Sequence, residues 1–273
     1  MSSLRLPYRL FKGPSLALRF FGAVDGRSFW DLDVLIPRER LEEVDRALLA
    51  EDVTRRSKTT FGVRLSTRFA HGWDYERGTL RLDLHWALAT HFSYRIDMAR
   101  LWKEDETVEI EGRTIPTLSD ESALLFFVLS FFEDLDRGAG RLKNVVDIEA
   151  MLCVMDSRTR WSDFLARAAD ERVEAIARAI LQLVVDLTGA ASRCPALVAE
   201  LATKPNGAPD SWSARHALVE SPRGGLGNKV WAAGLYACGR PAALAWWGVS
   251  LPFRLAAYNP TFFPRRASTT RGA

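Results

Sequence analysis

Three aspartates lie where they could bind a divalent metal ion. Residues 30–36, Trp-Asp-Leu-Asp-Val-Leu-Ile, alternate as in a strand, so that Asp31 and Asp33 share one face. Residues 79–88 read as a second strand, in which Asp83 lies opposite the apolar face. Neighbouring carboxylates repel each other unless a cation lies between them. The pattern indicates a metal site; the alternative is a polar strand face exposed to water.

Magnesium suits such a site because it prefers carboxylate oxygens and keeps positions open for water and substrate phosphates. Three carboxylates can hold two ions, one for the triphosphate of a nucleotide and one to activate an attacking hydroxyl group. We expect Asp31 and Asp33 to bridge the ions. Asp83 completes the site as a ligand and candidate general base, and these three are the predicted catalytic and metal-binding residues.

The phosphates of a nucleotide need a binding site of their own, and residues 12–15 offer one. Lys12 supplies a cation, Gly13 permits a tight turn, and Ser15 can cap a helix through residues 16–21. The N-terminus of a helix attracts anions. The alternative is that Lys12 is a surface cation. No GxxxxGK[ST] sequence occurs, which excludes a P-loop enzyme.

Strands and helices interleave around these residues, as in an α/β or α+β domain. We expect a helix over 38–50, strands over 53–57 and 64–69, and a hairpin or edge strand over 107–117 around Gly112. The pattern becomes helical near residue 118. The predicted helices there cover residues 119–132, 141–155, 161–169 and 173–188.

Composition sets limits on function. The chain has 273 residues, a net charge of +3 and a sequence pI of about 8.9, which suits an anionic small substrate better than a nucleic acid. Three widely spaced cysteines indicate reduced thiols, and residues 1–10 lack the apolar stretch of a signal peptide. These features predict a cytoplasmic protein.

The C-terminal part of the chain has a different composition. Residues 192–226 are rich in proline, glycine and serine and are predicted to form a loop or linker. Residues 228–263 are aromatic and apolar, but prolines interrupt them before they reach the length of a transmembrane span. We favour a tail packed against a domain. The alternative is peripheral contact with a membrane surface.

Several short sequences together resemble one family. Lys12-Gly13, Arg27, Asp-Leu-Asp-Val-Leu-Ile at 31–36 and Asp-Leu-His-Trp at 83–86 are similar to the uncharacterised nucleotidyltransferase family of the polymerase-beta-like superfamily. Arg-Leu-Lys-Asn-Val-Val-Asp-Ile at 141–148 resembles the helical-domain signature of that family. The resemblance covers about residues 8–155. It implies an α+β fold: a mixed sheet with flanking helices, followed by a helical domain.

We therefore assign residues 1–117 to a nucleotidyltransferase catalytic domain, residues 118–191 to a helical domain, and residues 192–273 to a linker and aromatic segment. The resemblance implies transfer of a nucleoside monophosphate from an NTP, with ATP as the expected donor and magnesium as cofactor. The acceptor is a hydroxyl or phosphate group of a small molecule, peptide or protein. The alternative is a catalytically degenerate module that binds a nucleotide or a partner.

The same resemblance implies nucleotide-binding residues, which are Lys12, Gly13, Ser15 and Lys143. The chain departs from the family in having Pro14 between Gly13 and Ser15, and Ser-Phe-Phe at 130–132 where a histidine is frequent.

Four further expectations concern particular side chains. We expect His85 to be a hydrogen-bonding support rather than a metal ligand, and Arg27 to close its loop onto a carboxylate. Lys143 and Asp147 are spaced as a helix ion pair, which is the alternative to phosphate binding by Lys143. The remaining expectation is a solvated helix end formed by the acidic side chains Glu133, Asp134 and Asp136.

Overall fold

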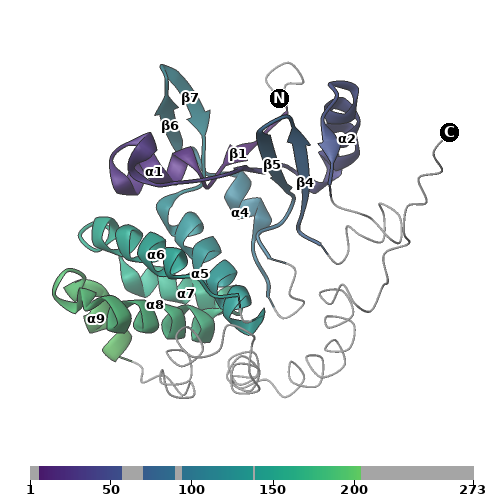
Figure 1. Ribbon diagram of the computed structural model, residues 1–273. Coiled ribbons are helices and arrows are strands. Elements are labelled where there is room, and N and C mark those ends of the chain that lie inside the picture. Colours follow the sequence, from purple (N-terminus) through teal and green to yellow (C-terminus); the bar gives the residue numbers. More distant parts are fainter. Residues whose placement is uncertain (1–5, 57–69, 90–93, 138, 204–273) are drawn as a thin grey trace.

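The computed structural model describes residues 6–56, 70–89, 94–137 and 139–203 (Figure 1). A five-stranded mixed sheet has the order β1-β2-β5-β4-β3, and β6 and β7 form a separate hairpin. β2 and β5 are parallel, whereas β1, β3 and β4 are antiparallel to their neighbours. The bounds are β1 (Arg9–Leu10), β2 (Leu32–Leu35), β3 (Thr54–Arg55), β4 (Gly72–Arg77), β5 (Leu80–His85), β6 (Thr107–Ile110) and β7 (Arg113–Pro116). The predicted α+β fold is confirmed.

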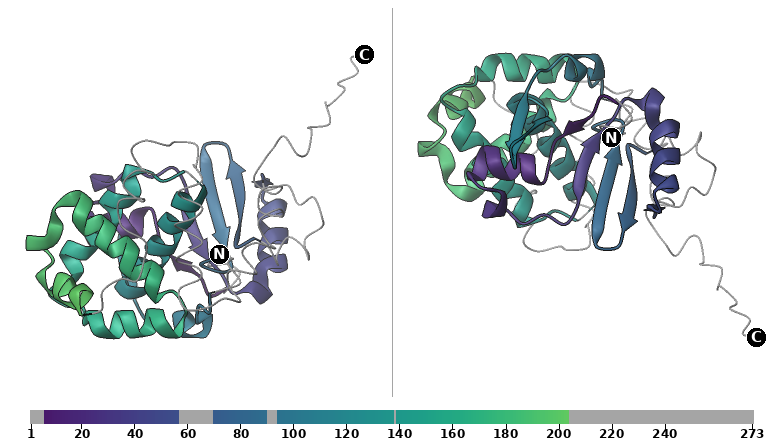
Figure 2. Two further views of the ribbon diagram at one scale, coloured as in Figure 1. Left: turned by 90° about the horizontal axis from the view of Figure 1, so that it is seen from below. Right: turned by 90° about the horizontal axis from the view of Figure 1, so that it is seen from above.

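Helices cover the sheet on opposite sides (Figure 2). One side carries α2 (Leu41–Ala50), and the other faces α1 (Pro14–Phe21) and a bundle of later helices. The short helix α4 (Met98–Trp102) precedes the β6–β7 hairpin. The bundle comprises α5 (Asp120–Arg137), α6 (Leu142–Met155), α7 (Trp161–Asp170), α8 (Glu174–Thr188) and α9 (Pro195–Ala202).

The alternation of β2 explains how the sheet divides two hydrophobic clusters. Val34 and Ile36 pack with the side chains of α2 and with Trp73 and Tyr75 of β4. Leu35 points to the other face and joins the cluster formed by α1 and the bundle. Asp33 shares the face of Leu35, because side chains two residues apart lie on the same side of a strand. The aspartate therefore faces the helical bundle.

The second cluster spans the predicted boundary at residue 118. It combines Phe11 and Leu16 with side chains of α5, among them Phe131 and Phe132. All four of these side chains are almost fully buried. α5 is buried on most of its surface, because residues 123–132 are apolar except for Ser130. The N-terminal elements and the bundle thus share one apolar core.

The predicted hairpin around Gly112 is confirmed. Ile110 pairs with Arg113, so that Glu111 and Gly112 alone form the turn. Both residues have positive φ, 50° and 72° respectively. This is the backbone of a type I′ turn, which matches the twist of two antiparallel strands.

Two expectations about the helical part are wrong. Glu133 and Asp136 are buried rather than solvated, because α5 continues through them to Arg137. Part of the expected loop over 192–226 is helix α9, which begins at Pro195. Asp156 accepts hydrogen bonds from the backbone N–H groups of Ala196 and Leu197 at this helix start. This cap cannot be read from the sequence around α9, where the local start signal is Pro195 at the first helical position.

The expected strand over 64–69 and the aromatic segment over 228–263 lie outside the described residues. Across the described ranges, every helix falls short of the length and apolar character needed to cross a membrane.

Candidate functional site

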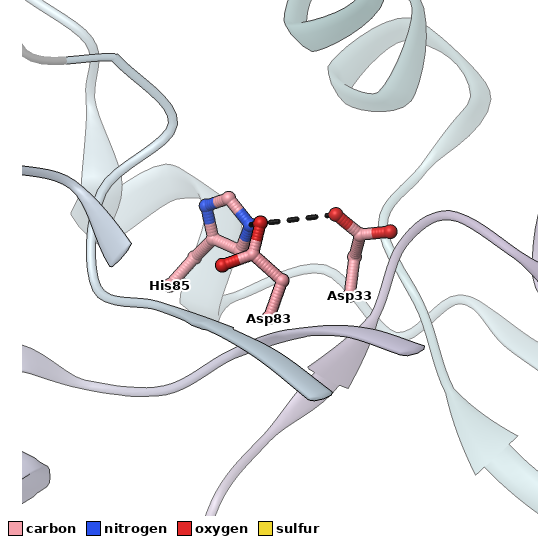
Figure 3. A group of neighbouring side chains, drawn as sticks. All are labelled: Asp33, Asp83 and His85. Atoms are coloured by element: carbon pink, nitrogen blue, oxygen red, sulfur yellow. Dashed lines mark ion pairs between the residues drawn. The ribbon is translucent and has the colours of Figure 1, made fainter. Parts of the chain in front are cut away.

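The candidate site lies where β2 and β5 run side by side. Their register pairs Asp33 with Asp83 and Leu35 with His85. The side chains of Asp33 and His85 are buried, with 4% and 2% of their surface exposed, whereas Asp83 is 27% exposed. Figure 3 shows the two carboxylates and the imidazole ring gathered at one point. Two of the three predicted aspartates, Asp33 and Asp83, therefore lie side by side in the sheet.

These three side chains form a potential metal-binding group. One ligand atom from each of Asp33, Asp83 and His85 lies within 4.8 Å of the others. His85 Nε2 is 3.0 Å from Asp83 Oδ2 and 3.4 Å from Asp33 Oδ1 (Figure 3). Neither ring nitrogen has a hydrogen-bond partner of suitable geometry among the described residues. Two carboxylates and an unsatisfied imidazole are a donor set that fits a divalent cation.

Asp31 lies beside this group but not within it. Its side chain is the more exposed of the two in the Asp-Leu-Asp sequence. Partial burial, and then the negative charge of Asp33, raise the pKa of Asp31 above its usual value. The charge of Asp83 acts in the same direction. The three predicted carboxylates are thus in electrostatic contact, although only two of them share the group with His85.

Lys12 supplies a positive charge to the site. Its Nζ atom lies 2.9 Å from Asp33 Oδ1 and 4.7 Å from the ring centre of Phe126 in α5. Burial alone would raise the pKa of Asp33, but Lys12, followed by His85, holds that pKa at about 2. Burial opposes the charged form of Lys12, yet Asp33 holds the pKa of Lys12 above its usual value. Lys12 is therefore a partner of Asp33 rather than a free surface cation.

His85 is held between these charges and a set of aromatic rings. Burial disfavours its protonated form, but Asp33 and Asp83 outweigh that effect and raise the pKa of His85. Phe11 contacts the imidazole edge-on at 5.0 Å between ring centres, and His71 stacks on it at 5.3 Å. These two ring contacts hold the imidazole beside the two carboxylates.

The turn before α1 differs from the expected helix cap. Gly13 has a φ of 55°, and a Cβ atom there would lie 3.3 Å from the carbonyl oxygen of Asp31. α1 begins at Pro14, whose fixed φ suits the first turn of a helix. Ser15 is therefore already inside the helix. Its Oγ atom is buried and lies 2.7 Å from Thr117 Oγ1, so it does not cap α1.

Lys143 and Asp147 of α6 both contact the loop before β2. Arg27 donates from Nε and Nη2 to the two carboxylate oxygens of Asp147, both at 2.7 Å. Lys143 donates from Nζ to the carbonyl oxygen of Ser28 at 2.5 Å. The expected closure of the Arg27 loop onto a carboxylate is confirmed. The expectation of an ion pair between Lys143 and Asp147 is wrong. Both carboxylate oxygens of Asp147 accept hydrogen bonds from Arg27 instead.

The electrostatic environment places Lys143 near the aspartates. Partial burial, and then the positive charge of Arg27, lower the pKa of Lys143, while Asp147 and Asp31 oppose this effect. The sequence did not indicate the contacts that Phe126, His71 and Asp147 make around the site. All three contacts depend on tertiary packing. Of these three residues, Asp147 alone was noted in the sequence, through its i, i+4 spacing from Lys143.

Comparison with known proteins identifies a matching family. The model of a family described as uncharacterised nucleotidyltransferase matches residues 1–189. No curated protein matches the chain.

Solved structures with some similarity include two of the antibiotic-resistance factor ANT(2'')-Ia. Its solution structure has 19% sequence identity and a TM-score of 0.41, over 62% of this chain and 83% of that chain. Its crystal structure with adenylyl-2"-tobramycin has 18% identity and a TM-score of 0.41, over 62% and 88% of the two chains. An antigenic nucleotidyltransferase-like protein from Paracoccidioides brasiliensis has 17% identity and a TM-score of 0.38, over 71% and 87%.

Proposed function

Because the chain belongs to the uncharacterised nucleotidyltransferase family, we propose that it transfers a nucleoside monophosphate from a magnesium-bound NTP to an acceptor. The acceptor group is a hydroxyl or phosphate of a small molecule, peptide or protein, and ATP is the expected donor. The observation that carries this proposal is the direct pairing of Asp33 with Asp83 in parallel strands. Beside them lies a buried imidazole whose ring nitrogens have no hydrogen bond of good geometry within the described part of the chain.

The proposed reaction is a single displacement at phosphorus. The acceptor oxygen forms a bond to the α-phosphorus, the bond from that phosphorus to the bridging oxygen breaks, and pyrophosphate leaves. Asp83 is the candidate base for the acceptor proton, because it is the more exposed of the two paired carboxylates. Asp31, Asp33 and Asp83 would hold the metal. Bound magnesium would neutralise phosphate charge and lower the pKa of the attacking hydroxyl.

Two lysines are suited to bind the triphosphate of the nucleotide. Lys12 forms an ion pair with Asp33. Lys143 is close enough to Asp31 and Lys12 for their charges to affect its pKa. Gly13 brings the backbone before α1 close to Asp31. We propose that these three residues, with the N-terminus of α1, bind the phosphates. Ser15 would contribute through the position of the helix rather than through its hydroxyl group, which contacts Thr117.

Two contacts favour the second candidate, a module that binds a nucleotide or a partner without catalysing a reaction. Lys12 forms an ion pair with Asp33, and the hydroxyl group of Ser15 contacts Thr117. A chain that had lost its metal would need such a cation to offset the buried carboxylate.

A transfer experiment distinguishes the two candidates. The purified protein is incubated with magnesium and each of the four NTPs labelled at the α-phosphate. A small-molecule fraction and a protein fraction of cell extract serve as acceptor sources. Transfer predicts label in one fraction and an equal amount of pyrophosphate, both lost in Asp33→Asn and Asp83→Asn. Nucleotide binding without transfer of label from any NTP would support the binding module instead.

A further inference from the structure

The contact between Arg27 and Asp147 joins two segments that are distant in the sequence. Arg27 lies in the loop before β2, and Asp147 lies in the second turn of α6, 120 residues later. The guanidinium group makes two parallel hydrogen bonds to the carboxylate, a geometry that fixes both position and orientation. Only 9% and 3% of the two side chains are exposed. Such a buried pair contributes little net stability, so its value lies in holding the segments in register.

The loop that Arg27 anchors leads directly to Asp31. Lys143, one turn before Asp147, binds the carbonyl oxygen of Ser28. Phe29 packs on Gly13, with its ring 3.6 Å from the position of a Cβ atom there. The carbonyl oxygen of Asp31 also lies close to Gly13. Residues 27–31 are therefore fixed at one end by α6 and at the other by the turn that begins α1.

We propose that Asp147 is a positioning residue, which acts through Arg27 to hold Asp31 and Lys143 in the arrangement that binds metal and triphosphate. Loss of the pair would release the loop without touching Asp33, Asp83 or His85. The inference rests on the proposed function, since it assigns Asp31 and Lys143 to that site.

The test measures binding of Mn²⁺ in the presence and absence of ATP, by electron paramagnetic resonance and calorimetry on the full chain. Mn²⁺ serves as a spectroscopic substitute for magnesium. Substitution of groups that orient metal ligands typically weakens metal affinity about 10–100-fold. We expect Asp147→Asn to weaken Mn²⁺ binding with ATP by at least about tenfold on that basis. Arg27→Lys keeps the charge but loses one of the paired donors, and it should show an intermediate loss.

Glu171→Gln is the matched control. Glu171 forms an equally buried ion pair with Arg167, 2.9 Å apart, within the helical bundle. This variant should lower thermal stability as Asp147→Asn does, but leave Mn²⁺ affinity unchanged. A purely structural role for Asp147 would make the two variants alike. If Asp147→Asn does not fold, the result for Arg27→Lys decides.

The outcomes separate this inference from the proposed function. Wild-type affinity for Mn²⁺ and ATP retained in folded Asp147→Asn or Arg27→Lys would overturn the positioning role alone. Absence of Mn²⁺ binding in the wild-type protein, with every NTP, would overturn both. Weakened binding in the two variants but not in Glu171→Gln would establish that Asp147 acts on the site.

Discussion

Asp33 and Asp83 face each other directly in the register of the parallel strands β2 and β5. A pair of carboxylates in this position requires positive charge nearby, because one of them is buried beneath the helical bundle. Lys12 and His85 provide that charge in the structure. We therefore expect a metal ion and Lys12 to compete for the carboxylate of Asp33.

Lys12→Met should destabilise the metal-free protein by about 3 kcal/mol, the low end of the cost of breaking a buried ion pair. The physical reason is that Asp33 would remain buried without its nearest cation. Urea denaturation in EDTA measures the loss. Magnesium should recover part of it, since the ion would supply the missing charge. Equal stability of the two proteins in EDTA would contradict this interpretation of the ion pair.

The charge of His85 should make stability depend on pH. Its pKa in the folded protein lies above the usual 6.5. Its contribution is therefore fully present below about pH 6.5 and is lost as the pH rises through the higher, folded value. The difference in unfolding free energy between wild type and His85→Gln, measured in EDTA from pH 5 to 9, should shrink with rising pH.

The titration of Asp33 does not contribute to the change in stability between pH 5 and 9. Its pKa in the folded protein is about 2, below the usual 3.8, so its contribution is lost only as the pH falls through that lower range. A difference between wild type and His85→Gln that grows with rising pH would show that the two carboxylates do not raise the pKa of His85.

Gly13→Ala should reduce both stability and Mn²⁺ affinity, whereas Gly78→Ala should reduce stability alone. Both glycines have positive φ, 55° and 58°, which costs a residue with a Cβ atom about 1 kcal/mol or more. Only at Gly13 would the new atom press on the carbonyl oxygen of Asp31. At Gly78, an added Cβ atom would have no described residue within 4 Å apart from its chain neighbours. Calorimetry with Mn²⁺ and ATP checks the contrast, and equal affinities would count against the close approach.

Asp156→Ala should destabilise the bundle by about 1–3 kcal/mol, because buried hydrogen-bond donors lose their acceptor. Asp156 accepts from Trp161 Nε1 and from two backbone N–H groups at the start of α9. Asp163→Ala is the control, since its ion pair with Arg160 is largely exposed and should matter by less than about 0.5 kcal/mol. Comparable losses for both variants in urea denaturation would argue against the capping role.

The sequence predicted the strand aspartates because alternation along a strand is a local property. Asp33 and Leu35 could be placed on one face, and Asp83 on the polar face of a second strand. The pattern does not encode which residue of one strand pairs with which residue of the next. The register of Asp33 with Asp83, and the burial of His85 next to them, therefore had to come from the structure.

The wrong expectations share a cause. The i, i+4 rule paired Lys143 with Asp147, but Arg27, 120 residues away, offers Asp147 two parallel hydrogen bonds. Ser15 was expected to cap a helix, but its hydroxyl group contacts Thr117, and the helix begins one residue earlier, at Pro14. The first residue of α9 is Pro195, but the side chain that caps this helix is Asp156, which is distant in the sequence. In each case a tertiary contact replaced the local one.

The metal site at Asp33 and Asp83 is tested most directly by titrating the wild-type protein with Mn²⁺ and ATP, followed by electron paramagnetic resonance, alongside Asp33→Asn and Asp83→Asn. We expect Mn²⁺ to bind the wild-type protein more tightly when ATP is present, and both substitutions to abolish this binding in folded protein. Undiminished Mn²⁺ and ATP binding in the two variants would contradict a metal site at Asp33 and Asp83.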